Sequence, residues 1–123
     1  MLSVLIVEDV ETMRKLIREV LSGIPGVSIS GTAANVPEAR RELSRHRPGL
    51  VLLDLVLPGE SGLELWPELR EKAVPTLILS ASPDPRVPEG ALGWLLKPAL
   101  KTLIEDRKRI QQALTVMLGL TGP

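Results

Sequence analysis

Apolar residues along this chain fall into short continuous runs, and between these runs they recur every three or four positions. A short continuous run bounded by turn residues is typical of a strand buried on both faces of a parallel sheet. The segment 27–32 instead alternates apolar and polar residues, as an edge strand does. We therefore predict strands at 2–7, 27–32, 50–54, 76–80 and 92–96.

The segments between these runs show the spacing of amphipathic helices. We predict helices over 13–24, 35–46, 63–72 and 100–118. Asn35 with Glu38 three residues later is typical of a capped helix start. Pro67 falls inside the third predicted helix and is expected to kink it. No convincing helix fits 81–90, which contains three prolines.

Strands that alternate with helices favour an α/β fold with a parallel, doubly wound sheet and right-handed crossovers. Five strands of this kind suit the flavodoxin-like order 2-1-3-4-5. In that order the carboxyl ends of the first, third, fourth and fifth strands come together. Those ends carry Glu8 and Asp9, Asp54, Ser80, and Lys97.

Composition narrows the possible functions. The 123 residues fit one domain, and a hydrophobic content of 44% excludes disorder. Fifteen basic and fifteen acidic residues leave no excess charge to favour a nucleic-acid or membrane partner. The absence of cysteine excludes thiolate sites, and the one histidine, His46, is expected to be a solvated residue at a helix end. No leader or membrane span is visible, so a soluble, cytoplasmic protein is expected.

The side chains at the strand ends suggest phosphoryl chemistry. Three carboxylates in one crevice repel one another, and a hard divalent cation such as Mg²⁺ relieves this. Lys97 and Ser80 add a mobile cation and a hydroxyl for a phosphate oxygen. These are the parts needed to form an aspartyl phosphate.

Each of these residues also has an ordinary structural explanation. Asp9 could cap the helix that follows, Asp54 could be a turn residue, and Ser80 and Lys97 could be unremarkable strand-end residues. Chance would have to place all of them together at predicted strand ends, which favours the functional interpretation.

Four motifs resemble the receiver domain of two-component response regulators. They are VLIVED at 4–9, VLLDLVLPGESG at 51–62, LILSA at 77–81 and GWLLKP at 93–98. The likeness covers essentially the whole chain, and the segment 12–15 is also similar to single-domain chemotaxis-type receivers. The resemblance implies one receiver domain over 1–123, with no output domain expected.

The resemblance also implies a role for each site residue. Asp54 would accept phosphate from a sensor histidine kinase or phosphotransfer protein. Mg²⁺ would be bound by Asp9 and Asp54, by Glu8 through water, and by the backbone carbonyl of Val56.

Three further roles follow from the same resemblance. Lys97 would contact the phosphoryl group, and Ser80 would move towards it on activation. Trp94 stands where the family usually has a Tyr or Phe switch residue. A partly buried anchoring role is the alternative for Trp94. A cis peptide bond is expected between Lys97 and Pro98.

The chain departs from the family pattern between Ser80 and Lys97, which are only 17 positions apart. This spacing is shorter than usual by about one helical turn or more. We therefore expect the fourth helix to be shortened or absent. Because receivers commonly dock partners or dimerise on that face, a non-standard protein partner or a different homodimer is expected.

Alternative functions remain open at this point. A receiver-fold interaction module that no longer switches is the main one. A phosphotransferase of the haloacid-dehalogenase type would need a second acid where Val56 stands. A flavodoxin would need a phosphate-binding loop where Glu8 and Asp9 would repel the phosphate. The leading prediction is a signalling phosphoacceptor, with no enzyme activity beyond its own phosphorylation and dephosphorylation, that acts by protein contact.

Overall fold

The computed structural model describes residues 2–81 and 87–96, together with Gln112 and Thr115. The predictions for Lys97 and for the Lys97–Pro98 peptide bond lie outside the described residues. So does most of the predicted C-terminal helix, of which Gln112 and Thr115 are described and helical.

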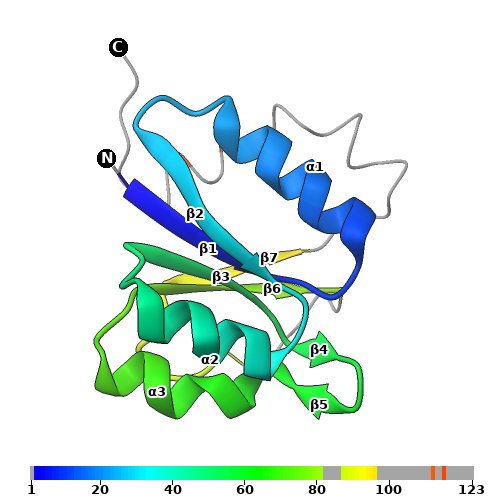
Figure 1. Ribbon diagram of the computed structural model, residues 1–123, viewed down its shortest axis with the longest axis vertical. Helices are drawn as coiled ribbons and strands as arrows, with labels where there is room; N and C mark the ends of the chain where they lie inside the picture. The colour runs from blue at the N-terminus through cyan, green and yellow to red at the C-terminus, as the bar shows by residue number, and fades with distance from the viewer. Residues whose placement is uncertain (1, 82–86, 97–111, 113–114, 116–123) are drawn as a thin grey trace.

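Five parallel strands form the main sheet, in the order β2-β1-β3-β6-β7 (Figure 1). Counted along the chain within this sheet, that order is the predicted 2-1-3-4-5, so the flavodoxin-like fold is confirmed. The last strand begins one residue later than predicted. The strands are β1 (Leu2–Val7), β2 (Val27–Ala33), β3 (Leu50–Asp54), β6 (Thr76–Ser80) and β7 (Gly93–Leu96).

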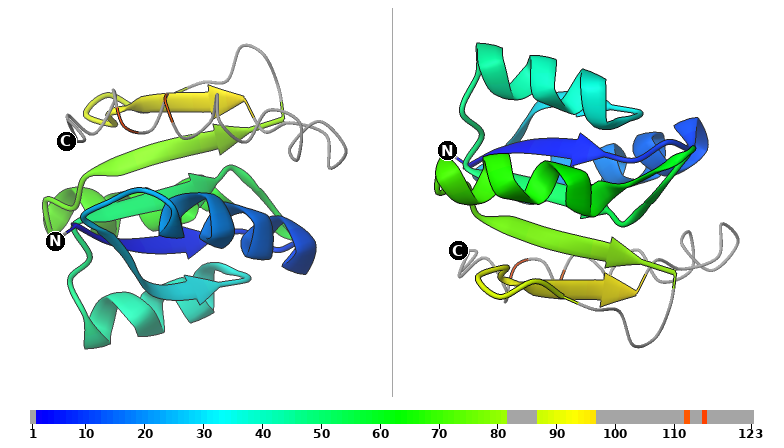
Figure 2. Two further views of the ribbon diagram at one scale, coloured as in Figure 1. Left: turned by 90° about the horizontal axis from the view of Figure 1, so that it is seen from above. Right: turned by 90° about the horizontal axis from the view of Figure 1, so that it is seen from below.

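Helices cover both faces of the sheet. Helix α1 (Glu11–Ser22) lies on one face, and helices α2 (Val36–Arg45) and α3 (Trp66–Glu71) lie on the other (Figures 1 and 2). Because successive side chains of a strand point to opposite faces, each strand contributes to two cores. Val4 and Ile6 of β1 belong to the core under α1, whereas Leu5 and Val7 belong to the core under α2 and α3.

The predicted start of α2 is confirmed. The side chain of Asn35 accepts a hydrogen bond of 2.9 Å from the backbone N–H of Glu38. The carboxylate of Glu38 in turn accepts one of 2.8 Å from the N–H of Ala34. These bonds satisfy the N–H of Glu38 in the first helical turn and the N–H of Ala34 just before it, so the helix begins where the sequence indicates.

The third predicted helix is divided, and the expected kink at Pro67 is wrong. A 3₁₀ helix, η1 (Gly62–Leu65), precedes α3, and Pro67 lies in the first turn of α3. A proline is well tolerated there because its missing N–H would have no helical partner. Pro67 therefore helps to start the helix.

A two-stranded antiparallel hairpin, which was not predicted, follows β3. It consists of β4 (Val56–Leu57) and β5 (Glu60–Ser61), joined by a turn at Pro58 and Gly59. Gly59 has a φ of 67°, a conformation that glycine adopts without strain. The hairpin projects from the carboxyl end of the sheet (Figure 1).

The expected reduction of the fourth helix holds for the described part of that segment. Residues 87–92 contain no helix. The five remaining positions, 82–86, are too few for three helical turns, so a regular three-turn helix between Ala81 and Gly93 is excluded. A cleft of about 550 Å³ lies beside this segment, lined by residues that include Trp66, Leu69 and Leu92.

Candidate functional site

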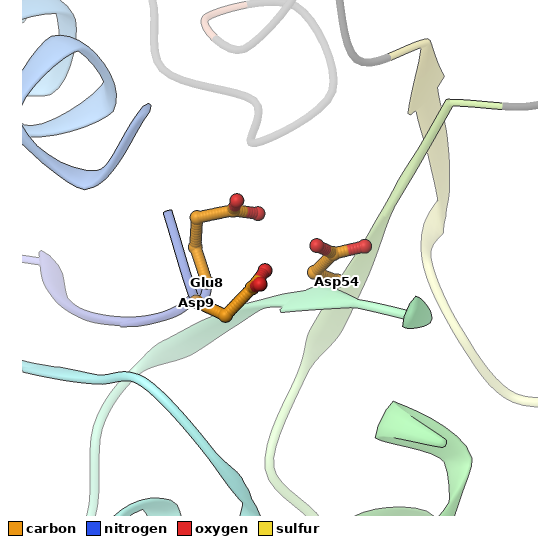
Figure 3. Close-up of side chains that lie close together, drawn as sticks. All are labelled: Glu8, Asp9 and Asp54. Carbon is orange, nitrogen blue, oxygen red and sulfur yellow. The ribbon is translucent and has the colours of Figure 1, made fainter. Parts of the chain in front are cut away.

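Three carboxylates meet at the carboxyl end of the sheet. Val7 of β1 pairs with Leu53 of β3, so Glu8 and Asp54 leave neighbouring strands at the same level. Glu8, Asp9 and Asp54 each place one carboxylate oxygen within 4.8 Å of the other two (Figure 3). The predicted convergence of these acids is therefore present.

The burial of this acidic cluster is unusual for charged groups. Glu8 is 0% exposed and Asp54 is 2% exposed, while Asp9 is half-buried. Buried carboxylates are costly unless a positive charge or hydrogen bonds compensate them. The cluster offers only hard oxygen donors, which suits Mg²⁺ better than a soft transition metal. The donor set and its spacing thus fit the predicted cation.

Several hydrogen bonds hold the turn after β1. The N–H of Glu8 donates to the carbonyl of Ala33 over 2.9 Å, and the N–H of Val10 donates to the Glu8 carboxylate over 3.3 Å. The guanidinium of Arg14 donates to the carbonyls of Glu8 and Asp9 over 2.7 and 2.9 Å. Asp9 does not cap α1, because the N-cap residue is Val10. The simplest structural explanation for Asp9 is thereby removed.

The turn after β3 is held mainly by backbone contacts. The N–H of Val56 donates to the Asp54 carboxylate over 3.1 Å, and that of Gly62 donates to the carbonyl of Leu55 over 2.9 Å. A Cβ atom on Gly62 would lie 2.0 Å from the carbonyl oxygen of Asp54. Only glycine fits against the strand end that carries Asp54.

The other predicted site residues that the structure describes lie on the two strands beyond β3 and in the turn that follows β3. Asp54 pairs with Leu79, so Ser80 lies one residue further along the adjacent strand, where it is buried. Trp94 pairs with Ile78, lies on the edge strand β7 and is 37% exposed. Val56 follows Asp54 by two positions and is 74% exposed. The roles of these residues remain predictions, and Lys97 lies outside the described residues.

Two residues of the site had no predicted role. Gly62 ends one of the four motifs that carried the family resemblance, and Arg14 lies in the segment 12–15, which resembles chemotaxis-type receivers. Nothing in their spacing indicated that one binds the backbone of the acidic pair and the other packs against the strand of Asp54. No helix in the described part of the chain is long and apolar enough to cross a membrane.

The chain is similar to known response regulators. A family model described as the response regulator receiver domain matches residues 4–107. The transcriptional regulatory protein MalR of Bacillus subtilis is 36% identical over 123 residues, which cover 91% of this chain and 52% of that protein. The chain spans about half or less of the length of the first curated relatives it matches.

Solved structures agree with this relationship. The response regulator domain of Thermotoga maritima CheB superposes with a TM-score of 0.80, covering 98% of both chains; at 18% identity this shows the fold alone. The Thermotoga maritima response regulator TrrA, solved in complex with Mg²⁺ and BeF, is 28% identical. It superposes with a TM-score of 0.70, covering 90% of this chain and 99% of that one. The family model, the sequence similarity and the shared fold together show that this chain belongs to the response regulator receiver domain family of two-component systems.

Proposed function

We propose that this receiver domain accepts a phosphoryl group on Asp54 in a Mg²⁺-dependent reaction and passes the signal on by protein contact. The observation that carries the proposal is the convergence of Glu8, Asp9 and Asp54, with one oxygen of each within 4.8 Å of the others. The donor is a sensor histidine kinase or a phosphotransfer protein of the cytoplasm. The only reactions proposed are phosphorylation and dephosphorylation of the domain's own Asp54.

The residues of the acidic cluster hold the cation. Asp9 and Asp54 would bind it through their carboxylates, Glu8 would act through water, and Val56 would contribute its backbone carbonyl. When bound, Mg²⁺ neutralises negative charge on the phosphoryl group that is being transferred. Burial of Glu8 and Asp54 supports this assignment, because a cation offsets the cost of keeping both carboxylates ionised.

Asp54 is the nucleophile. One of its carboxylate oxygens forms a bond to phosphorus as the bond from phosphorus to the histidine nitrogen breaks, and the nitrogen keeps the electron pair. The N–H of Val56 donates to Oδ1 of Asp54 over 3.1 Å, which fixes the orientation of the carboxylate before the reaction. Lys97 contacts the transferred group and Ser80 moves towards it, while Trp94 serves as the switch residue.

Intact-mass analysis after incubation with acetyl phosphate tests the proposal directly. Wild-type protein is expected to gain one phosphoryl group with Mg²⁺ and none without it. Asp54→Asn removes the nucleophile, so its adduct should be lost. Glu64→Gln serves as a matched control, because it removes one carboxylate from an exposed position of η1. Loss of the adduct in this control, or its retention in Asp54→Asn, would contradict the assignment.

A second candidate function is a receiver-fold interaction module that does not switch. The observation that favours it is the segment 87–92, which has no helix where a receiver commonly presents its output face. Beryllofluoride with Mg²⁺ separates the two candidates, because a switching domain changes its tryptophan fluorescence on binding. A normal phosphoryl adduct from acetyl phosphate, together with no change in the fluorescence of Trp66 and Trp94 on adding beryllofluoride, would favour the second candidate.

A further inference from the structure

Arg14 connects helix α1 to the backbone of the acidic pair. Its Nη1 atom donates hydrogen bonds to the carbonyl oxygens of Glu8 and Asp9, over 2.7 and 2.9 Å. The side chain is half-buried, and both acceptors belong to the turn between β1 and α1. One nitrogen therefore binds two consecutive peptide groups of the turn.

These two carbonyls lie between two regular hydrogen-bond systems. The strand β1 ends at Val7, and the N-cap of α1 is Val10, whose carbonyl accepts the N–H of Arg14 over 2.9 Å. The carbonyls of Glu8 and Asp9 thus precede the helical pattern and depend on other donors. Arg14 supplies a charged donor to both.

We propose that Arg14 is a positioning residue for the metal site, an inference that rests on the proposed function. The two peptide groups that Arg14 binds set the directions in which the Glu8 and Asp9 side chains leave the backbone. Holding both carbonyls fixes those directions and keeps the carboxylates within reach of Asp54 before the cation binds.

The charge of Arg14 acts in the opposite direction. A guanidinium beside a cation site repels the cation, so its removal should strengthen Mg²⁺ binding if charge alone mattered. Loss of positioning should weaken binding instead. The direction of the change in affinity therefore separates the two roles.

Arg18 provides a matched control on the same helix. It lies one turn after Arg14 and is exposed. Both arginines line a surface hollow of about 190 Å³. Arg14→Met and Arg18→Met each remove one positive charge and leave an unbranched side chain. Only the first removes the two hydrogen bonds to the acidic turn.

Isothermal titration calorimetry of the full chain with MgCl₂ measures the effect. We expect Arg14→Met to bind Mg²⁺ roughly tenfold more weakly than wild type, as for other residues that orient metal ligands. Arg18→Met should bind equally well or slightly more tightly. Equal or tighter binding by a folded Arg14→Met would overturn the inference.

The kinetics of adduct formation with acetyl phosphate give a second measurement. A positioning role predicts that Arg14→Met needs more Mg²⁺ to reach half of its maximal rate, while the maximal rate stays near that of wild type. A rate of adduct formation that stays below the wild-type rate even at saturating Mg²⁺ would overturn the inference. If circular dichroism shows Arg14→Met to be unfolded, Arg14→Gln replaces it, with the same expected weakening.

The failure of this inference can be told apart from the failure of the proposed function. Wild-type protein that binds no Mg²⁺ and forms no adduct would remove both proposals. Wild-type protein that binds Mg²⁺ and forms the adduct, with an Arg14→Met variant of equal affinity, would remove only the role of Arg14.

Discussion

The two turns that carry the acidic cluster are built in different ways. The turn after β1 is held by a long side chain, because Arg14 reaches back from α1 to the carbonyls of Glu8 and Asp9. The turn after β3 is closed by its own backbone, with Gly62 packed against the carbonyl of Asp54. A flexible side chain can be shortened or exchanged, whereas a backbone contact leaves no room for adjustment. We therefore expect substitutions in the turn after β1 to adjust the properties of the metal site. The turn after β3 should tolerate almost no substitution.

Gly62→Ala has the largest expected effect. Its Cβ would lie 2.0 Å from the carbonyl oxygen of Asp54 and 3.2 Å from the Cα of Leu55, both of them backbone atoms. Relieving this overlap requires the start of η1 to move away from the end of β3, at a cost of about 3 kcal/mol in the free energy of unfolding. Urea denaturation monitored by tryptophan fluorescence measures the loss.

Gly59→Ala is the control for that experiment. Gly59 has a φ of 67°, and a Cβ atom added there would meet nothing within 4 Å, so only conformational strain opposes alanine. The expected cost is about 1–2 kcal/mol. A Gly62→Ala variant no less stable than Gly59→Ala would show that the backbone closure after β3 is looser than its contacts imply.

Magnesium should stabilise the protein through both turns. At a Mg²⁺ concentration about one hundred times its dissociation constant, the free energy of unfolding should rise by about 2.7 kcal/mol. Asp9→Asn removes a proposed ligand from the first turn and Asp54→Asn removes one from the second, so each should reduce the gain. Thermal unfolding with and without MgCl₂ checks this, and an undiminished gain in either variant would remove that residue from the site.

Glu60→Ala tests how the hairpin after β3 is tied to the rest of the fold. The Glu60 carboxylate accepts a hydrogen bond of 2.7 Å from the N–H of Val36, at the start of α2. Losing this charged acceptor at a helix N-terminus should cost about 1 kcal/mol. Asn35→Ala should cost a similar amount by removing the cap of the same helix, without touching the hairpin. If Glu60→Ala binds Mg²⁺ more weakly and Asn35→Ala does not, the contact between Glu60 and Val36 also supports the turn that carries Asp54.

Arg40→Ala should have the smallest effect. The Arg40 guanidinium meets the Glu68 carboxylate over 2.6 Å, and this pair joins α2 to α3 rather than to either turn. The Arg40 side chain is 50% exposed, so the ion pair should contribute only about 0.5 kcal/mol and less at high salt. Denaturation at low and high NaCl concentration measures it. A larger, salt-independent loss would mean that this link supports the fold beyond its charge.

The strands and the acidic residues were the features most readily predicted. The runs at 50–54 and 76–80 match β3 and β6 at both ends, because a strand buried on both faces shows a nearly continuous apolar run. Glu8 and Asp54 were recognisable because each interrupts such a run at its carboxyl end. The cap at Asn35 was predictable for a similar reason, since its hydrogen bonds are local in sequence.

The errors arose where a local pattern had more than one structural solution. Pro67 fits the interior of an amphipathic pattern, but the chain forms a 3₁₀ turn first and places the proline at the start of α3. The hairpin of β4 and β5 has only two residues in each strand, which is too few for an alternating pattern to be visible.

The prediction of one receiver domain over 1–123 with no output domain remains a prediction.

The sequence by itself determined the five main strands, their order in the sheet and the edge of the sheet where the acids gather. It could do so because strands buried on both faces are continuous apolar runs, whereas amphipathic helices repeat apolar residues every three or four positions. The tertiary structure decided that Arg14 binds the turn after β1 and that Gly62 closes the turn after β3. Those contacts depend on the path of the backbone through space, and a one-dimensional pattern does not record which atoms that path brings together.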